Sequence, residues 1–487
     1  MTSIRRGLTG ALAGALLLGV GPASAQDWPQ WRGPNRDGKV AGVAAPSAWP
    51  KEFPKKWTVK VGDGVATPAL VGDRLYVIGR EGGDEVVRCL AVADGKEIWA
   101  EKYPQKGASG PAGGFAGPRS SPVVSMGRVV TLGCSGTLSC FDAGSGKLAW
   151  RKTDYSDKLP RFSTSSSPII IDGRVIVQLG GENSGAVVAY NLSDGAESWK
   201  YSGDGTTYSS PVFASLAGSD AIIALGSSKL VGLDASSGKE LWSAPFKTGY
   251  NACTPVVHGD LVIVSGGERG AQPFTKAFKV EKSGAGLAAK EAWTNKELGV
   301  QYNTPVVHKD RVYGLSARDV FFCLDLATGK TLWTAPKTPG APLVGGPGAP
   351  KGPPGEGKGE PGGRRRPPGE GGPPGVAGGP PPGGQPGQGR PGGPPGGGPP
   401  GGGRRGGMGG RGGMMGGAGY GSIVGVGDVM LALTPSMELI VFSPDDKKYA
   451  EIARIKVAAS PTYAYPIVSG DRLIVKDKDS VSMLALK

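Results

Sequence analysis

The chain has 487 residues, five Cys, two His and a formal net charge of +14 at pH 7. Half of that charge, +7, lies in residues 337–419, which are mostly Gly and Pro and hold ten Lys or Arg and three Glu. The remainder carries too little positive charge to indicate a nucleic-acid surface. The Cys and His show no metal-ligand spacing, and the sequence lacks nucleophile–base and phosphate-loop motifs, so nothing points to a metal centre or a hydrolase.

Residues 1–25 have the layout of a secretory signal peptide. Arg5 and Arg6 precede a short apolar run that ends at Val20, and Ala23-Ser24-Ala25 supplies the small residues of a cleavage site. The run is shorter than the ~20 residues of a membrane-spanning helix, and no later segment is apolar enough to span a bilayer. We expect cleavage after Ala25 and an exported protein, periplasmic or extracellular, that is not transmembrane.

Residues 26–56 contain Trp28, Trp31 and Trp49 among many Pro and Gly residues, which break regular structure. We predict an irregular N-terminal arm that packs its Trp side chains on the surface of the following domain. A ligand-binding arm is the alternative.

From residue 57 onward, one short pattern recurs with a period of about 40–50 residues, which is typical of β-propeller blades. Its clearest copy is Leu324–Trp333, LDLATGKTLW, with Gly329 in a turn before the Trp. The Gly suits a tight hairpin that needs a positive φ, and one large aromatic per unit can fill the wedge between packed sheets. The Trp residues to which we assign this structural role are Trp57, Trp99, Trp150, Trp199, Trp242, Trp293 and Trp333.

Each unit opens with a marker, a small polar residue followed by Pro and an apolar run. Pro cannot donate to a sheet ladder, so this strand belongs at an edge, and the innermost strand of a blade, beside the central channel, is such an edge. The markers begin at Thr67, Ser121, Ser167, Ser210, Thr254 and Thr304, with degenerate copies at Ser422 and Tyr465. We therefore predict eight blades, each with four antiparallel strands.

The last unit, from Tyr463 to Lys487, contains three strand patterns and lacks a fourth. Lys56–Val61, which carries Trp57 ahead of the first marker, can supply the missing outer strand. Pairing the N- and C-terminal strands closes the ring and removes its open edges. The predicted fold is an all-β propeller, with blades 1–6 and the outer strand of blade 8 in residues 57–336 and blades 7 and 8 in residues 420–487.

Residues 337–419 interrupt the array between blades 6 and 7. They contain no aromatic residue, and they cannot bury enough apolar surface to offset the entropy lost on ordering. We expect a disordered basic insert that is either a spacer or a contact for an acidic polymer of the cell envelope.

The Cys and His positions follow the repeat. Cys89, Cys140 and Cys323 share one repeat position, where other blades have Ala or Gly, so we expect small buried side chains and no structural disulfide. His258 and His308 also share a position, in the turn between the first and second strands. We predict no catalytic residue and no metal ligand among them.

The residues just before the markers lie at one mouth of the predicted channel. Tyr and Asn there, with one Arg, form a plausible binding rim, because Tyr combines apolar area with a polar tip. The alternative is that the Tyr side chains plug the channel. The predicted ligand- or partner-binding residues are Arg119, Tyr208, Tyr250, Asn251, Tyr302, Asn303 and Tyr463.

The repeated Asp–Gly-turn–Trp unit with its Ser-Ser-Pro-like inner strand resembles the repeat of the pyrroloquinoline quinone (PQQ) propeller family. The resemblance covers about residues 57–336 and 420–487, and DWPQWRGPNRDG also resembles the start of many exported members. The family includes quinoprotein dehydrogenases, which hold PQQ and calcium on the propeller axis. It also includes BamB-like proteins, similar to the propeller subunit of the outer-membrane β-barrel assembly machine, which are non-catalytic and bind protein partners.

The residues favour the BamB-like branch. The alcohol and methanol dehydrogenases use a ring formed by adjacent Cys residues, and no two Cys are adjacent in this chain. Calcium and a reaction base need carboxylates at the axis, whereas the predicted rim has no Asp or Glu. The nearest candidates for a cofactor site are Glu182, Asn183 and Glu268, in Gly-rich turns where solvated side chains are the simpler interpretation.

Our leading hypothesis is an exported, non-catalytic scaffold that binds protein partners in the cell envelope as a monomer and needs no cofactor. The first alternative is a quinoprotein oxidoreductase that uses PQQ with calcium. The second is a propeller that binds envelope polysaccharide through the Tyr-rich rim.

Overall fold

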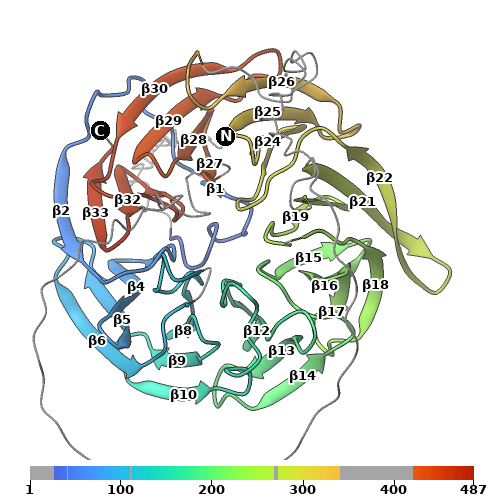
Figure 1. Ribbon diagram of the computed structural model, residues 1–487, viewed down its shortest axis with the longest axis horizontal. Coiled ribbons are helices and arrows are strands. Elements are labelled where there is room, and N and C mark those ends of the chain that lie inside the picture. The colour runs from blue at the N-terminus through green and yellow to red at the C-terminus, as the bar shows by residue number, and fades with distance from the viewer. Residues whose placement is uncertain are drawn as a thin grey trace, which may run out of the picture. The chain divides into compact units, whose positions relative to one another are not determined.

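The structure is a computed structural model that describes residues 27–40, 42–109, 112–249, 251–267, 273–340 and 420–486. The predicted signal peptide and nearly all of the predicted insert lie outside these residues. Within the described ranges the regular elements are β-strands, arranged as eight sheets around a central axis (Figure 1). The eight-bladed propeller predicted from the repeat is confirmed.

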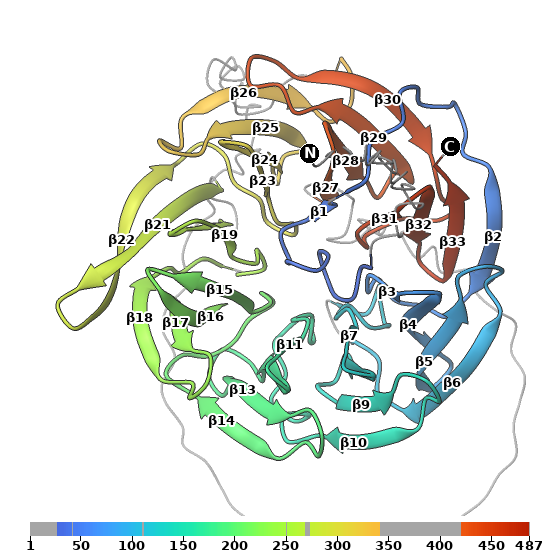
Figure 2. The ribbon, with the colours of Figure 1, turned by 180° about the vertical axis from the view of Figure 1, so that it is seen from behind.

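Blades 1–4 each contain four antiparallel strands that run in chain order from the channel to the rim (Figure 2). Blade 1 has β3 Ala69–Val71, β4 Arg74–Glu81, β5 Asp84–Ala91 and β6 Glu97–Pro104; blade 2 has β7 Val123–Ser125, β8 Arg128–Leu132, β9 Leu138–Asp142 and β10 Leu148–Lys152. Blade 3 has β11 Ile169–Ile171, β12 Arg174–Leu179, β13 Ala186–Asn191 and β14 Glu197–Tyr201; blade 4 has β15 Val212–Leu216, β16 Ser219–Leu225, β17 Lys229–Asp234 and β18 Glu240–Pro245.

Blades 5–8 repeat this order. Blade 5 has β19 Val256–His258, β20 Leu261–Gly266, β21 Phe274–Ser283 and β22 Gly286–Asn295; blade 6 has β23 Val306–His308, β24 Arg311–Leu315, β25 Val320–Asp325 and β26 Thr331–Pro336. Blade 7 has β27 Ser422–Val426, β28 Val429–Leu433, β29 Glu438–Ser443 and β30 Ala450–Lys456, and a short strand, β1 Lys39–Val40, pairs in parallel with β27. Blade 8 has β31 Ile467–Ser469, β32 Arg472–Lys476 and β33 Ser480–Ala485.

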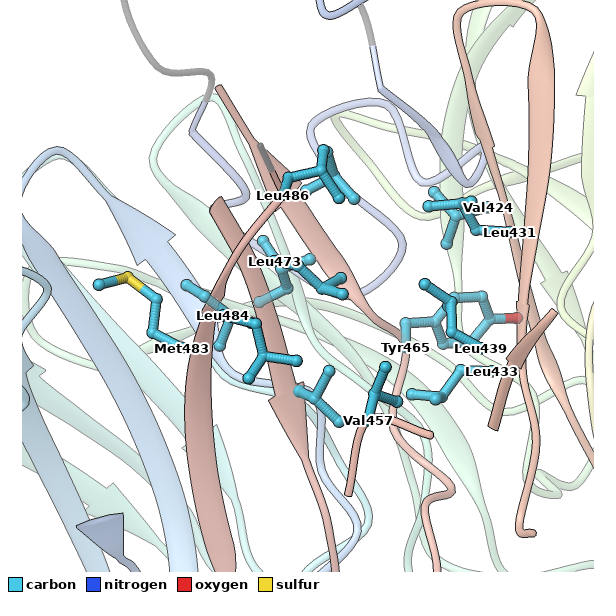
Figure 3. Close-up of a cluster of buried hydrophobic side chains, with 14 of the residues drawn as sticks. Val424, Leu431, Leu433, Leu439, Val457, Tyr465, Leu473, Met483, Leu484 and Leu486 are labelled. Carbon is cyan, nitrogen blue, oxygen red and sulfur yellow. The ribbon is translucent and has the colours of Figure 1, made fainter. Parts of the chain in front are cut away.

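The fourth strand of blade 8 comes from the other end of the chain. Strand β2, Lys55–Lys60, pairs antiparallel with β33, with Trp57 opposite Met483. This pairing closes the ring as the sequence predicted. Beside it, the largest hydrophobic cluster joins blades 7, 8 and 1, and Figure 3 shows Leu431 and Leu439 of blade 7 with Leu473 and Leu484 of blade 8 in this cluster.

The blades are coupled by Trp side chains that dock on the next blade. In five cases the indole covers the turn Gly of the following blade: Trp57 on Gly95, Trp99 on Gly146, Trp150 on Gly195, Trp199 on Gly238 and Trp293 on Gly329. Each of these indoles also donates its Nε1–H to a main-chain carbonyl of that blade; for example, Trp293 lies 2.8 Å from the Leu326 oxygen. The packing contact requires a Gly at a fixed place in the turn, which explains the repeated motif.

Blade 5 departs from this rule. Its β21–β22 hairpin has ten residues in each strand and projects beyond the rim (Figures 1 and 2). The Nε1 atom of Trp242 in blade 4 is buried and has no hydrogen-bond partner among the described residues. The longer hairpin therefore replaces the short Gly turn that receives Trp in blades 1–4 and 6.

The small position shared by the Cys residues lies opposite the Trp of the same blade. Cys89 pairs with Trp99 across the strands, Cys140 with Trp150 and Cys323 with Trp333, and the equivalent in blade 4 is Gly232, opposite Trp242. A Cβ on Gly232 would lie 2.2 Å from the Trp242 ring. Cys89, Cys140 and Cys323 are buried free thiols, which agrees with small residues that leave room for the indole.

Lys476 lies at the seam between blades 8 and 1. Its side chain is buried, and its ammonium group donates to the main-chain oxygens of Gly64, Asp477 and Lys478 at 2.8, 2.9 and 3.2 Å. Burial lowers the pKa of Lys476 to about 8.

We predict that Gly329→Ala destabilises the propeller more than Gly173→Ala. Both Gly have φ near +70°, at +70° and +71°, so Ala incurs a backbone cost of about 1–2 kcal/mol at either site. A Cβ at Gly173 meets open space, whereas a Cβ at Gly329 would lie 2.3 Å from Cε3 of Trp293. The extra cost at Gly329 should be about 1–3 kcal/mol, typical of overpacking, measured by urea unfolding. Equal losses for the two variants would contradict the docking role.

The buried ammonium group of Lys476 should make stability depend on pH. An unfolded lysine titrates near pH ~10.4, so between about pH 8 and that value the unfolded chain binds more protons and the free energy of unfolding rises with pH. Relative to Lys476→Met, the wild type should gain up to about 3 kcal/mol across this window. The exposed control Lys478→Met should keep the wild-type slope, and parallel curves for Lys476→Met and wild type would refute the expectation.

Candidate binding site at the mouth of the channel

The inner strands are linked by a ring of hydroxyl groups at the markers. The marker hydroxyl of one blade accepts the main-chain N–H of the preceding blade's marker; for example, Ser121 N–H donates to Ser167 Oγ at 3.0 Å. Six such links are present in the described chain, including one from Tyr465 N–H to Thr67 Oγ1 that crosses the closure. These links join seven of the eight markers, all except Ser422, and the residues that precede the markers converge on the axis.

The convergent residues line one cavity of about 320 Å³. The residue two positions before each marker contributes in every blade: Val65, Arg119, Ser165, Tyr208, Ala252, Tyr302, Tyr420 and Tyr463. Asn303, Phe162 and Trp31 also line it.

Five of the predicted rim residues line this cavity: Arg119, Tyr208, Tyr302, Asn303 and Tyr463. Asn251 is buried beneath the surface, where its Nδ2 donates to the Gly226 oxygen at 2.7 Å and its Oδ1 accepts from the Thr248 hydroxyl. It holds a loop, and it is not among the lining residues. Tyr250 lies outside the described residues.

Tyr420 is a lining residue that the sequence analysis missed. It stands two residues before the marker Ser422, so the register alone could have located it. The degenerate marker and the adjacent Gly-rich insert hid this position.

Aromatic rings form one wall. Tyr302 and Tyr420 stack with centroids 4.5 Å apart, Tyr463 meets Tyr420 edge-on at 5.2 Å, and Phe115 meets Tyr463 edge-on at 4.8 Å. Tyr302 is 38% exposed, whereas Tyr420 and Tyr463 are half-buried. Burial raises the pKa of both Tyr420 and Tyr463, so their hydroxyl groups stay protonated at neutral pH.

Arg119 supplies the charge. Its Nη2 donates to the main-chain oxygens of Ala112 and Phe115 at 3.0 and 2.8 Å, while its Nη1 is buried and has no hydrogen-bond partner among the described residues. Burial lowers the pKa of Arg119, and the nearby charge of Asp63 acts in the opposite direction. The described lining residues include no Asp or Glu.

The N-terminal arm closes the channel below the cavity, which corrects the prediction that it packs on the outer surface. Trp28 is buried and exchanges two main-chain hydrogen bonds with Leu70 of blade 1. Trp31 packs edge-on against Tyr465, with centroids 5.5 Å apart, at the cavity floor. Figure 2 shows the chain before β1 inside the ring of inner strands.

Two buried arginines hold the arm there. Arg32 donates to the main-chain oxygens of Thr304 and Pro305 at 3.0 and 2.8 Å and to the Tyr465 hydroxyl at 2.9 Å. Arg36 donates to the Pro211 oxygen at 2.6 Å and also to the Pro168 oxygen.

The inner strands are sheet edges, so they leave carbonyl groups directed at the axis, and the guanidinium groups of the arm satisfy them. Burial lowers the pKa of Arg36 to about 9, so the group remains charged at neutral pH. The Trp residues of the arm led to the prediction of a surface position. The arm is placed at the axis by Arg32 and Arg36, which bind the inner strands.

The residues around the axis do not fit calcium. Calcium takes 6–8 oxygen ligands, usually with several carboxylates, and the described cavity lining offers none. No group of three or more His, Cys, Asp or Glu with metal-binding geometry occurs in the described ranges. Glu182 and Asn183 lie exposed in the β12–β13 turn, away from the cavity lining, and Glu268 lies outside the described residues.

The fold and the axial cavity define a propeller of the PQQ-repeat type. The family described as "Outer membrane protein assembly factor BamB" matches residues 36–212 and 83–335, and the chain belongs to this family. Residues matched to the family cover most of the described blades.

Individual relatives share less than a third of their aligned residues with this chain. BamB of Burkholderia pseudomallei is 28% identical over 288 residues, which cover 57% of this chain and 68% of that protein. Quinohemoprotein alcohol dehydrogenase ADH-IIG of Pseudomonas putida is 28% identical over 141 residues, which cover 28% of this chain and 19% of that protein.

Two solved structures share the fold. The crystal structure of BamB from Moraxella catarrhalis matches with a TM-score of 0.54 at 14% identity, covering 88% of this chain and 97% of that one. The quinohemoprotein alcohol dehydrogenase from Comamonas testosteroni matches with a TM-score of 0.58 at 12% identity, covering 94% and 80%. In the described residues, we find no helix with the length and apolar character of a membrane span.

We predict that Arg32→Met and Arg36→Met each destabilise the protein. Each change leaves buried carbonyl groups of the inner strands unpaired, at a cost of about 1–3 kcal/mol for each group. Urea unfolding measures the loss. Lys51→Met, an exposed charge change on the same arm, should stay within ±0.5 kcal/mol. An arm that merely lies in the channel would give three similar, small effects.

Proposed function

We propose that this protein is an exported, non-catalytic propeller that acts as a protein-binding scaffold in the cell envelope and engages its partner through the mouth of the channel. Membership of the BamB family is the observation that carries the proposal. The exposed aromatic rim with a single Arg supports it, because such residues are typical of protein-interface anchors.

The arrangement at the axis favours binding over oxidation. The described cavity contains no carboxylate that could serve as a base or a calcium ligand, and the arm occupies the channel below it. We further propose that the protein works as a monomer without a cofactor and that the basic insert can contact an acidic envelope polymer.

The second candidate is a PQQ- and calcium-dependent oxidoreductase. The similarity to quinohemoprotein alcohol dehydrogenase ADH-IIG and the axial position of the cavity are the observations in its favour. A PQQ titration with calcium separates the two functions, because a ligand at 100 times its Kd stabilises the folded state by about 2.7 kcal/mol. The scaffold proposal expects no saturable quenching of Trp fluorescence and no rise in Tm.

Site-specific photo-crosslinking in intact cells tests the scaffold function. A photoreactive amino acid at Tyr302, which is 38% exposed at the mouth, should form a discrete crosslinked product with an envelope protein. The matched control is Ile98, which is 45% exposed on the outer strand β6 and lies away from the cavity. The proposal fails if the mouth position gives no product, or if both positions give the same products.

A further inference from the structure

Arg119 is a half-buried cation whose Nη1 is buried and has no hydrogen-bond partner among the described residues. A buried ionised group without a partner is costly, and buried polar groups in native proteins are nearly always hydrogen-bonded. Within the described chain, Nη1 has no acceptor, while the two bonds from Nη2 to the Ala112 and Phe115 oxygens fix the guanidinium plane. The group is therefore oriented in advance for an anion that arrives from outside.

The walls around Arg119 suit an aromatic or apolar side chain. Tyr302, Tyr420 and Tyr463 form a contiguous aromatic surface. Phe162 and Tyr208, whose ring centroids lie 6.0 Å from each other, also line the cavity. At about 320 Å³ the cavity is at the small end of the ~300–1,000 Å³ range of ligand pockets. The arm closes it below, so only a short tip can enter from the open face.

The neighbouring surface is basic. A second depression, of about 870 Å³, is lined by Arg80, Lys106 and Arg161 together with Ser and Thr residues, and its described lining contains no Asp or Glu. It adjoins the cavity at consecutive residues, because Phe162 lines the cavity while Arg161 and Ser163 line the depression. Asp154 and Asp157 lie in the loop beside it without lining it. This face therefore complements an acidic partner.

We propose that the axial cavity receives the tip of a loop of the partner protein that presents an Asp or Glu next to an aromatic residue. The carboxylate pairs with Nη1 of Arg119, and the aromatic side chain packs on the Tyr302–Tyr420 wall. This inference rests on the scaffold function proposed above and names the chemistry of the partner. One guanidinium provides one anion site, so a single carboxylate matches the cavity better than a polyanion.

Selection from a library of loops tests the proposal. The library carries five random residues closed by a disulfide, displayed on phage and selected on the purified full-length protein. We expect enrichment of Asp or Glu beside Trp, Tyr or Phe. The best loop, made as a free peptide, should lose at least tenfold in affinity when its carboxylate is changed to the amide. Loops without acidic enrichment, or an amide peptide that binds equally well, overturn the proposal.

A double-mutant cycle assigns the effect to Arg119. Arg119→Gln should weaken the acidic peptide at least tenfold and leave the amide peptide unchanged, and Arg119→Lys should restore part of the affinity because it keeps the charge but not the fork. The control is Arg472→Gln, at the first residue of β32, which should leave both affinities unchanged. An additive result, in which both peptides weaken equally on Arg119→Gln, means that Arg119 only supports its loop and overturns the proposal.

The two proposals can fail separately. If Tyr302 still crosslinks its partner in the Arg119→Gln background, the scaffold function stands and the acidic-loop inference is wrong. If the wild type gives no crosslink at Tyr302, the scaffold function itself is wrong. Binding of acetate or indole-3-acetate with the same dependence on Arg119, without any acidic loop selected, would instead identify a site for free organic acids.

Discussion

The docking of one blade's Trp on the next blade's Gly turn is the interaction on which the ring depends. It combines three requirements at one place: a positive φ, a missing Cβ and an exposed carbonyl for the indole N–H. Each dock ties a blade to its neighbour, so the last blade needs a Trp that only β2 can provide. Trp57 lies on Gly95 of blade 1 while its strand pairs with β33 of blade 8, so the dock between blades 8 and 1 is formed across the ring closure.

At the axis, the inner strands are sheet edges whose carbonyl groups have no partner within the blades. The guanidinium groups of Arg32 and Arg36 in the N-terminal arm bind these carbonyl groups. The arm also closes the channel at one end, so the axial cavity opens on one face only. Arg32 and Arg36 donate hydrogen bonds to main-chain oxygens of blades 3, 4 and 6, which are far apart in the sequence. The cavity that remains lies at the mouth, where the side chains ahead of the markers converge.

The repeat made most of the fold predictable, since blades, turns and strand order are local features that recur eight times. The same register predicted Arg119, Tyr208, Tyr302 and Tyr463 at one mouth, although it did not reveal Tyr420 beside the insert. The arm could not be placed from sequence because it does not repeat and its contacts are long-range. Arg32, for example, binds the oxygen of Thr304, 272 residues away. The blades follow from the sequence period. The position of the irregular arm instead depends on the carbonyl groups of the inner strands that the assembled ring leaves unpaired.

Three arginines near one axis show how structural and recognition roles can be distinguished. Arg32 and Arg36 are surrounded by carbonyl groups of the ring itself, so their charge is already accommodated. Arg119 is only half-buried and less saturated, because its Nη1 has no hydrogen-bond partner among the described residues while the residue lines an aromatic cavity. Nη1 is already out of contact with water in the unliganded protein, so a carboxylate that reaches it supplies a hydrogen bond that the free protein lacks. Selectivity for a carboxylate then follows from this charge-assisted hydrogen bond, which a neutral partner cannot form with the same strength.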